Sequence, residues 1–199
     1  MRLWWSDSWE IRHGQPLHLV LALYVRDAAG LGPVGNPLLP PLDPPVRRAD
    51  LPPMDLEAAG EQWARWWRRC WSQDEPKILM ELNEPGLPGF DDAPELQELL
   101  RRLLEPAGEW SSVRHEADFD AMVERTRIPS DDGLSALVRD RERQLRRRAR
   151  PFRLAITELP LAGKAGWRLG PEAVVVTPDL VRDRAAFLAF IRPAVEEVA

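Results

Sequence analysis

Short segments in which apolar and polar residues alternate predict strands, because successive side chains of a strand point to opposite faces of a sheet. Residues 152–159 alternate in this way, and residues 2–12 are also predicted to form a strand. Residues 17–26 are almost continuously apolar, as in a strand that is buried on both faces. Shorter candidates follow at 77–82, 164–169 and 173–176. The pattern predicts about five or six strands. The two segments nearest the N-terminus, 2–12 and 17–26, predict an N-terminal hairpin.

Apolar residues that recur at steps of three and four predict about five helices. Asp55 and Thr177 stand where the N-cap residue of a helix is expected. Pro106 and Pro151 are expected to end the helices before them, because proline disrupts a helix interior. The predicted helices cover residues 55–73, 92–105, 110–127 and 130–149, with a last helix that begins at Thr177.

These elements predict an α+β fold with a single domain over residues 1–199. A short, mostly antiparallel sheet is expected to pack with the helices, and C-terminal strands are expected to precede the C-terminal helix. Residues 31–53 hold eight prolines, which exclude a regular helix or strand there. Leucines and valines interleave with these prolines, so we expect an extended segment that lies over the core of the domain.

The composition is that of a soluble globular protein, since 44% of the residues are hydrophobic and 30% are charged. The longest apolar run, residues 19–25, is far shorter than the roughly 20 residues that span a bilayer. The single cysteine excludes an intrachain disulfide and favours a reducing compartment. We expect a cytoplasmic protein with no membrane partner. The excess of arginine over lysine is typical of a GC-rich bacterial genome.

Charge is unevenly distributed along the chain, whose formal net charge is −5. Residues 74–132 are strongly acidic, whereas residues 137–153 are rich in arginine. Such a cluster predicts binding of an anion or a nucleic acid, because arginines neutralise phosphates. The alternative is structural, since cations also complement the C-terminal end of a helix. The candidate residues are Arg143, Arg146, Arg147, Arg148 and Arg150.

No complete catalytic, metal or nucleotide motif is present. The histidines at positions 13, 18 and 115 lack the spacing of metal ligands, and Cys70 lies on a predicted apolar stripe. The glycines of residues 30–35 match a dinucleotide fingerprint in spacing, but no helix is predicted to follow them. We therefore expect no metal and no cofactor, and a structural role for the cysteine.

Carboxylates leave one enzymatic alternative open. Hydrolases use pairs of acids of which one is protonated and the other ionised. A hydrolase or nuclease-like enzyme would use such acids together with arginines in a cleft. The candidates include Glu81, Glu84, Asp91, Asp92, Asp118 and Asp120.

Tryptophan supports the first hypothesis, which is a non-enzymatic protein–protein interaction or accessory module. The chain has nine tryptophans, and four of them fall in the predicted helix at 55–73. One narrow helix face does not bury four indoles, and tryptophan is enriched at the centres of interfaces. We therefore predict a partner-binding surface, for another protein or a second copy, at Trp63, Trp66, Trp67 and Trp71.

Overall fold

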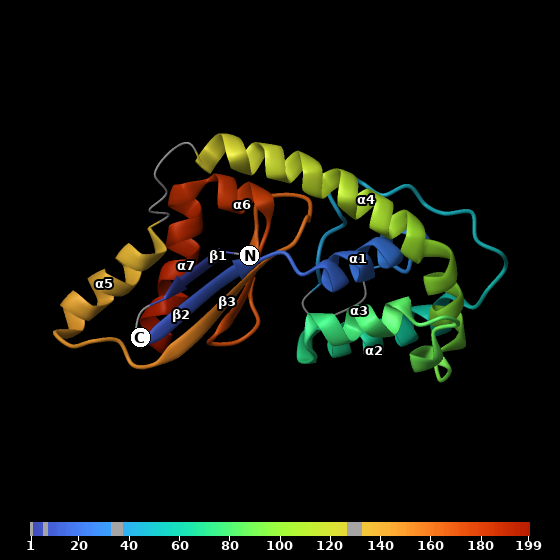
Figure 1. Cartoon of the computed structure of the whole chain (residues 1–199), viewed down its shortest axis with the longest axis horizontal. Helices are drawn as coiled ribbons and strands as arrows, with labels where there is room; N and C mark the ends of the chain where they lie inside the picture. The colour runs from blue at the N-terminus through green and yellow to red at the C-terminus, as the bar shows by residue number, and fades with distance from the viewer. Residues whose placement is uncertain (1, 6–7, 33–37, 127–132) are drawn as a thin grey trace. The chain divides into compact units, whose positions relative to one another are not determined.

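The structure is a computed structural model that describes residues 2–5, 8–32, 38–126 and 133–199. At residues 2, 4 and 115–126 it describes the backbone but not the side chains. Contacts divide the chain into two compact units. Unit 1 consists of Met1–Gln15 and Val123–Ala199, and unit 2 of Pro16–Met122. Unit 2 is therefore inserted in the sequence of unit 1 (Figure 1). This division does not test whether the chain folds as one domain, which stays a prediction.

Unit 1 is built on one five-stranded sheet. Its strands are β1 (Arg2–Trp5), β2 (Trp9–Gly14), β3 (Phe152–Glu158), β4 (Gly166–Arg168) and β5 (Ala173–Val176), in the order β1-β2-β3-β5-β4. The three central strands β2, β3 and β5 are parallel, and the edge strands are antiparallel to their neighbours. The predicted α+β class is confirmed. The expectation of a mostly antiparallel sheet is wrong, because a long connection that includes unit 2 joins β2 to β3 in place of a tight turn.

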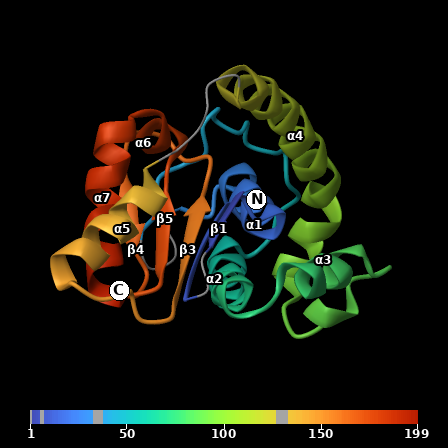
Figure 2. The same cartoon turned by 60° about the vertical axis from the view of Figure 1, so that its left-hand side comes forward.

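One face of this sheet is buried under three helices, α5 (Leu134–Leu145), α6 (Pro178–Arg182) and α7 (Arg184–Val198) (Figure 2). The alternation predicted for residues 152–159 is confirmed, since Phe152, Leu154 and Ile156 are buried. They form the core of unit 1 with side chains from β2, β5 and the helices, among them Trp9, Ile11, Val174, Val176, Leu137, Val138, Phe187, Ile191 and Val195.

Unit 2 is helical. It contains α1 (Leu17–Ala29), α2 (Leu56–Ser72), α3 (Glu75–Asn83), the short 3-10 helix η1 (Pro88–Phe90) and most of α4 (Pro94–Thr126), which extends into unit 1 (Figure 1). The prediction of a helix capped by Asp55 is confirmed, because its carboxylate accepts hydrogen bonds from the N–H groups of Glu57 and Ala58. In the described part of the chain, no helix is both long and apolar enough to cross a membrane.

The strands predicted at 17–26 and 77–82 are wrong, because both segments are helical. A continuous apolar run has no period, so burial on all sides looks alike in a helix and in a strand. Leucine and alanine dominate α1 and favour a helix, and Gly30 ends it in the left-handed conformation, at φ 65°. In α3 the buried residues Ile78 and Leu82 are four apart, which is the helical spacing.

Helix α4 passes through Pro106, so the predicted end at this residue is wrong. Proline costs a helix one hydrogen bond and a steric clash. The buried stripe nevertheless continues across it, from Leu99 and Leu103 to Ala107. Packing of this stripe offsets the cost of the proline.

The predicted helix that begins at Thr177 is divided into α6 and α7 at Asp183. The Thr177 hydroxyl caps the first helix, as predicted, and the Asp183 carboxylate accepts a hydrogen bond from the N–H of Ala186 at 3.0 Å. This bond and the ammonium group of Lys164 hold the pKa of Asp183 below its usual value.

The proline-rich segment, in its described part from residue 38 onward, packs on α1. The guanidinium of Arg26 is 4% exposed and donates to the carbonyl oxygens of Leu39 and Pro40, at 3.1 and 2.7 Å. The Asp27 carboxylate accepts from the N–H of Leu42 at 2.7 Å. The ion pair between buried Arg26 and half-buried Asp27 thereby satisfies backbone groups that lack a regular partner.

Candidate anion-binding groove

Three of the four tryptophans of α2 lie in the core of unit 2. Trp63, Trp66 and Trp67 are 0, 3 and 2% exposed. The indole N–H of Trp63 donates to the carbonyl of Ala22 at 2.8 Å, and the rings of Trp63 and Trp67 stack with centroids 5.3 Å apart. Trp71 alone is half-buried. The burial of three indoles argues against a partner-binding surface that all four tryptophans share. The sequence did not indicate this burial, because it does not show that α2 is covered on more than one face.

In the part of the chain that the structure describes, the candidate acids are not gathered into one catalytic cluster. Glu81 pairs with Arg69 at 2.8 Å, and the Asp91 carboxylate accepts from the Gln97 side chain at 2.9 Å. Glu84 and Asp92 are exposed, and the side chains of residues 118 and 120 lie outside the described part. Among the described residues, no group of three His, Cys, Asp or Glu side chains is arranged to hold a metal ion.

Cys70 and two of the three histidines, His13 and His18, contact other groups of the protein. Cys70 is buried, and burial raises the pKa of its thiol to about 12, so the reactive thiolate is suppressed near neutral pH. The buried ring of His18 lies 2.9 Å from the carbonyl oxygen of Cys70. His13 lies 3.0 Å from Glu158 at the ends of β2 and β3 and stacks on Phe187. The side chain of residue 115 lies outside the described part.

Two hollows lie side by side on the surface of unit 1. The first, of about 590 Å³, is lined by Ala136, Arg139, Asp140, Glu142, Arg143, Arg147 and Arg148. The second, of about 460 Å³, is lined by Trp5, Ser8, Trp9, Ser135, Arg139, Glu142 and Arg148. Three residues, Arg139, Glu142 and Arg148, line both. We call the two hollows together the arginine groove.

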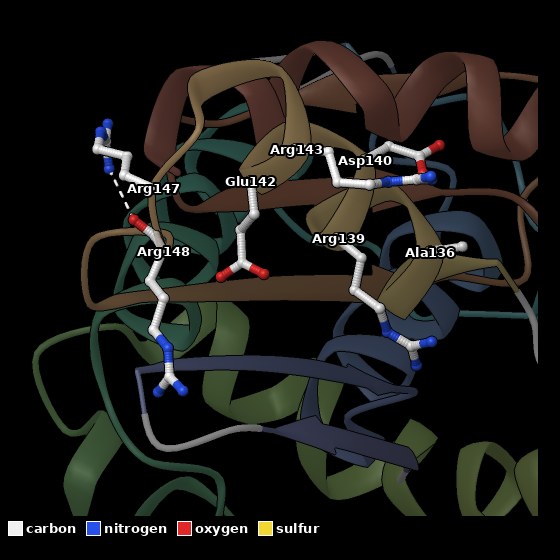
Figure 3. A pocket seen from close by; sticks show the side chains of 7 residues that line it. All are labelled: Ala136, Arg139, Asp140, Glu142, Arg143, Arg147 and Arg148. Carbon is white, nitrogen blue, oxygen red and sulfur yellow. Dashed lines mark hydrogen bonds and ion pairs between the residues drawn. The ribbon is translucent and has the colours of Figure 1, made fainter.

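Helix α5 supplies most of this groove through its amphipathic pattern. Its residues Leu134, Leu137 and Val138 are buried against the sheet, so the opposite face is left to solvent. Arg139 and Arg143 are four residues apart and therefore neighbours on that exposed face. In Figure 3 the side chains of Arg139 and Arg148 extend toward the same side, with the carboxylate of Glu142 between them.

The end of α5 brings the next arginines back to the groove. Arg146 adopts the left-handed conformation, with φ 52° and ψ 32°, where a glycine is usual. The N–H groups of Arg146 and Arg147 donate to the carbonyls of Arg143 and Glu142, both at 3.3 Å, which is the Schellman pattern. The predicted end near Pro151 is therefore wrong, and the helix stops at Leu145 because of this turn.

Three of the five predicted anion-binding residues line the groove, namely Arg143, Arg147 and Arg148. Arg146 and Arg150 are exposed but do not line it. Arg139 lies in the predicted basic segment 137–153 but is not among the five candidate residues, although its four-residue spacing from Arg143 was a usable signal. It had no signal for Trp5 or Ser8, because they reach the groove through the pairing of strands.

The polar contacts leave two guanidinium groups for a ligand. Arg143 pairs with Asp140, and Arg147 donates to the carbonyl oxygens of Arg148 and Ala199 at 2.9 and 3.2 Å. The Glu142 carboxylate accepts from the N–H of Ala149 at 2.9 Å. Within the described residues, neither Arg139 nor Arg148 has an acid at ion-pair distance.

The two units differ in the sign of their charge. Unit 1 contains 17 Lys and Arg against 13 Asp and Glu, a net charge of +4, whereas unit 2 contains 10 against 19, a net charge of −9. The arginine groove therefore lies in the basic part of an acidic protein, which favours the approach of anions to it. Comparisons of the chain with protein-family models, with curated proteins and with solved structures found no match.

Proposed function

We propose that this protein is a non-enzymatic binding module whose arginine groove takes an anionic partner. The observation that carries the proposal is the pair Arg139 and Arg148. These guanidinium groups come from different segments, extend toward the same side, and have no acid partner among the described residues. Guanidinium groups bind phosphates and carboxylates through charge-assisted, often bidentate hydrogen bonds.

The helix dipole does not account for this pair. Cations that complement the dipole belong in the last turn of a helix, because the effect falls off within that turn. Arg139 lies in the middle of α5, and Arg148 lies beyond its end. The dipole explanation therefore applies to Arg143 more than to either of these two residues.

The enzymatic alternative has less support in the geometry. The candidate acids of unit 2 whose side chains are described, Glu81, Glu84, Asp91 and Asp92, are exposed or paired with basic and amide groups. In the groove itself, Asp140 is paired with Arg143 and Glu142 is bound to a backbone N–H. A binding role needs only the two arginines, so it is the function that we propose.

Binding of inorganic polyphosphate, an anionic chain without bases, tests this proposal. The full chain is titrated against fluorescent polyphosphate at 50 and 200 mM salt. We expect salt-dependent binding, and at least a tenfold loss in the double variant Arg139→Ala/Arg148→Ala. The matched control is Arg65→Ala/Arg68→Ala, which removes two exposed arginines from α2. Absence of salt-dependent binding, or an equal loss in the control, overturns the proposal.

A further inference from the structure

We infer that the anionic partner is a single-stranded nucleic acid, whose phosphates contact Arg139 and Arg148 while a base stacks on Trp5. This inference rests on the proposed function of the arginine groove and adds the chemical class of the ligand. Its starting point is the second hollow, in which an aromatic residue and two guanidinium groups without an acid partner in the described part of the chain line one surface.

Trp5 is the aromatic residue of this surface that is available to a ligand. It ends the edge strand β1 and is 71% exposed, the most exposed tryptophan of the described chain. The neighbouring Trp9 is 8% exposed and stacks on Phe152 with ring centroids 6.3 Å apart, so it belongs to the core. An indole that contributes little to the core is suited to stacking with a planar ligand.

Strand pairing places Trp5 near the arginines despite the distance in sequence. Trp5 lies opposite Glu10 in the antiparallel pair of β1 and β2, and Trp9 lies opposite Phe152 in the parallel pair of β2 and β3. The N–H of Phe152 donates to the carbonyl of Ser8 at 3.3 Å. Trp5, Ser8 and Arg148 therefore line one hollow at this end of the three strands.

The combination of groups favours a single strand over other polyanions. Proteins that bind single strands combine a basic groove with exposed aromatic side chains, because bases stack on the rings while arginines follow the phosphates. A duplex keeps the faces of its bases stacked inside, so it does not use such a ring. An acidic peptide satisfies the arginines but gives no base-sized planar group to the indole. The two hollows also fall in the size range of about 300–1,000 Å³ that is usual for ligand pockets.

The test compares four labelled ligands on the full chain: a ten-nucleotide oligothymidylate, a ten-base-pair duplex, decaglutamate and polyphosphate. We expect the oligothymidylate to bind most tightly and to quench tryptophan fluorescence. Trp5→Ala should weaken its binding by roughly 5- to 150-fold, the range for loss of one stacked base, and should leave polyphosphate binding unchanged. Trp5→Phe should retain most of the affinity, which separates stacking from a defect in folding.

Leu3→Ala is the matched control, because it truncates another exposed apolar residue, 49% exposed, on the same strand. It should change the binding of oligothymidylate by less than twofold. Tighter binding of decaglutamate or of the duplex, or no effect of Trp5→Ala, overturns the inference while the anion-binding function stands. Failure of all four ligands to bind overturns the proposed function itself.

Discussion

Replacing Arg146 with glycine is expected to stabilise the protein, although it removes a long side chain. Arg146 has φ 52° and ψ 32° at the end of α5. The left-handed conformation costs a residue with a Cβ atom about 1–2 kcal/mol, and glycine adopts it freely. The end of α1 shows the preferred solution, because Gly30 holds the same position there with φ 65° and ψ 38°.

The magnitude follows from two opposing effects. Glycine removes the conformational cost of about 1–2 kcal/mol, but it also gives the unfolded chain more freedom, which offsets about 0.5–1 kcal/mol. The side chain of Arg146 is exposed and lines neither hollow of the arginine groove, so its loss should cost little. We expect a net increase in the free energy of unfolding of about 0.5–1 kcal/mol.

Urea unfolding followed by circular dichroism measures this change as an increase in the midpoint concentration at constant slope. Arg150→Gly is the control, because Arg150 is also exposed but is not among the described residues with positive φ. It should be neutral or slightly destabilising. A decrease in stability for Arg146→Gly as large as for Arg150→Gly would refute the reasoning from the left-handed turn.

Three further predictions concern charge, burial and backbone conformation. Glu142→Gln should tighten polyphosphate binding about two- to fivefold in a salt-dependent manner, because it removes a negative charge between Arg139 and Arg148. The glutamine keeps an acceptor for the N–H of Ala149. The control Glu84→Gln, at an exposed position of unit 2, should change polyphosphate binding little. Burial raises the pKa of Cys70 from 9.0 to about 12, so the thiol contributes stability below pH about 9 that is lost as the pH rises toward 12. The unfolding free energy of the wild type should therefore fall over this range by more than that of Cys70→Ala. Equal slopes of unfolding free energy against pH for the two proteins would contradict the prediction. Gly30→Ala should lower the melting temperature because it puts a Cβ atom at φ 65°, whereas Gly108→Ala, in a helix with open space around it, should raise it slightly.

Local signals in the sequence were sufficient for several elements of the fold. The alternation at residues 152–159 and the N-caps at Asp55 and Thr177 depend on neighbours within a few residues, and they gave β3 and the starts of α2 and α6 correctly. Residues 17–26 carried no such signal, because an uninterrupted apolar run fits any element that is buried on all sides. Its leucines and alanines, its Gly30 cap and its packing against α2 and α3 together favour the helix.

Sheet topology was decided by tertiary structure. The parallel pairing of β2 with β3 joins strands that are more than 130 residues apart in the chain, and nothing in the local pattern of either strand specifies a parallel neighbour. The passage of α4 through Pro106 has the same origin, because the packing of a buried stripe outweighs the local preference of one residue.

The arginine groove also combines features that are visible in the sequence with features that only the fold decides. A cluster of arginines is visible in sequence, and three of its five predicted members, Arg143, Arg147 and Arg148, line the groove. The sequence does not show which arginines lack an acid partner, because ion pairs depend on side chains brought together from several elements. It also does not show that Trp5 lies beside Arg148, since strand pairing alone brings these residues together. Composition and spacing thus determined the charge of the surface, and the folded sheet decided which residues share it.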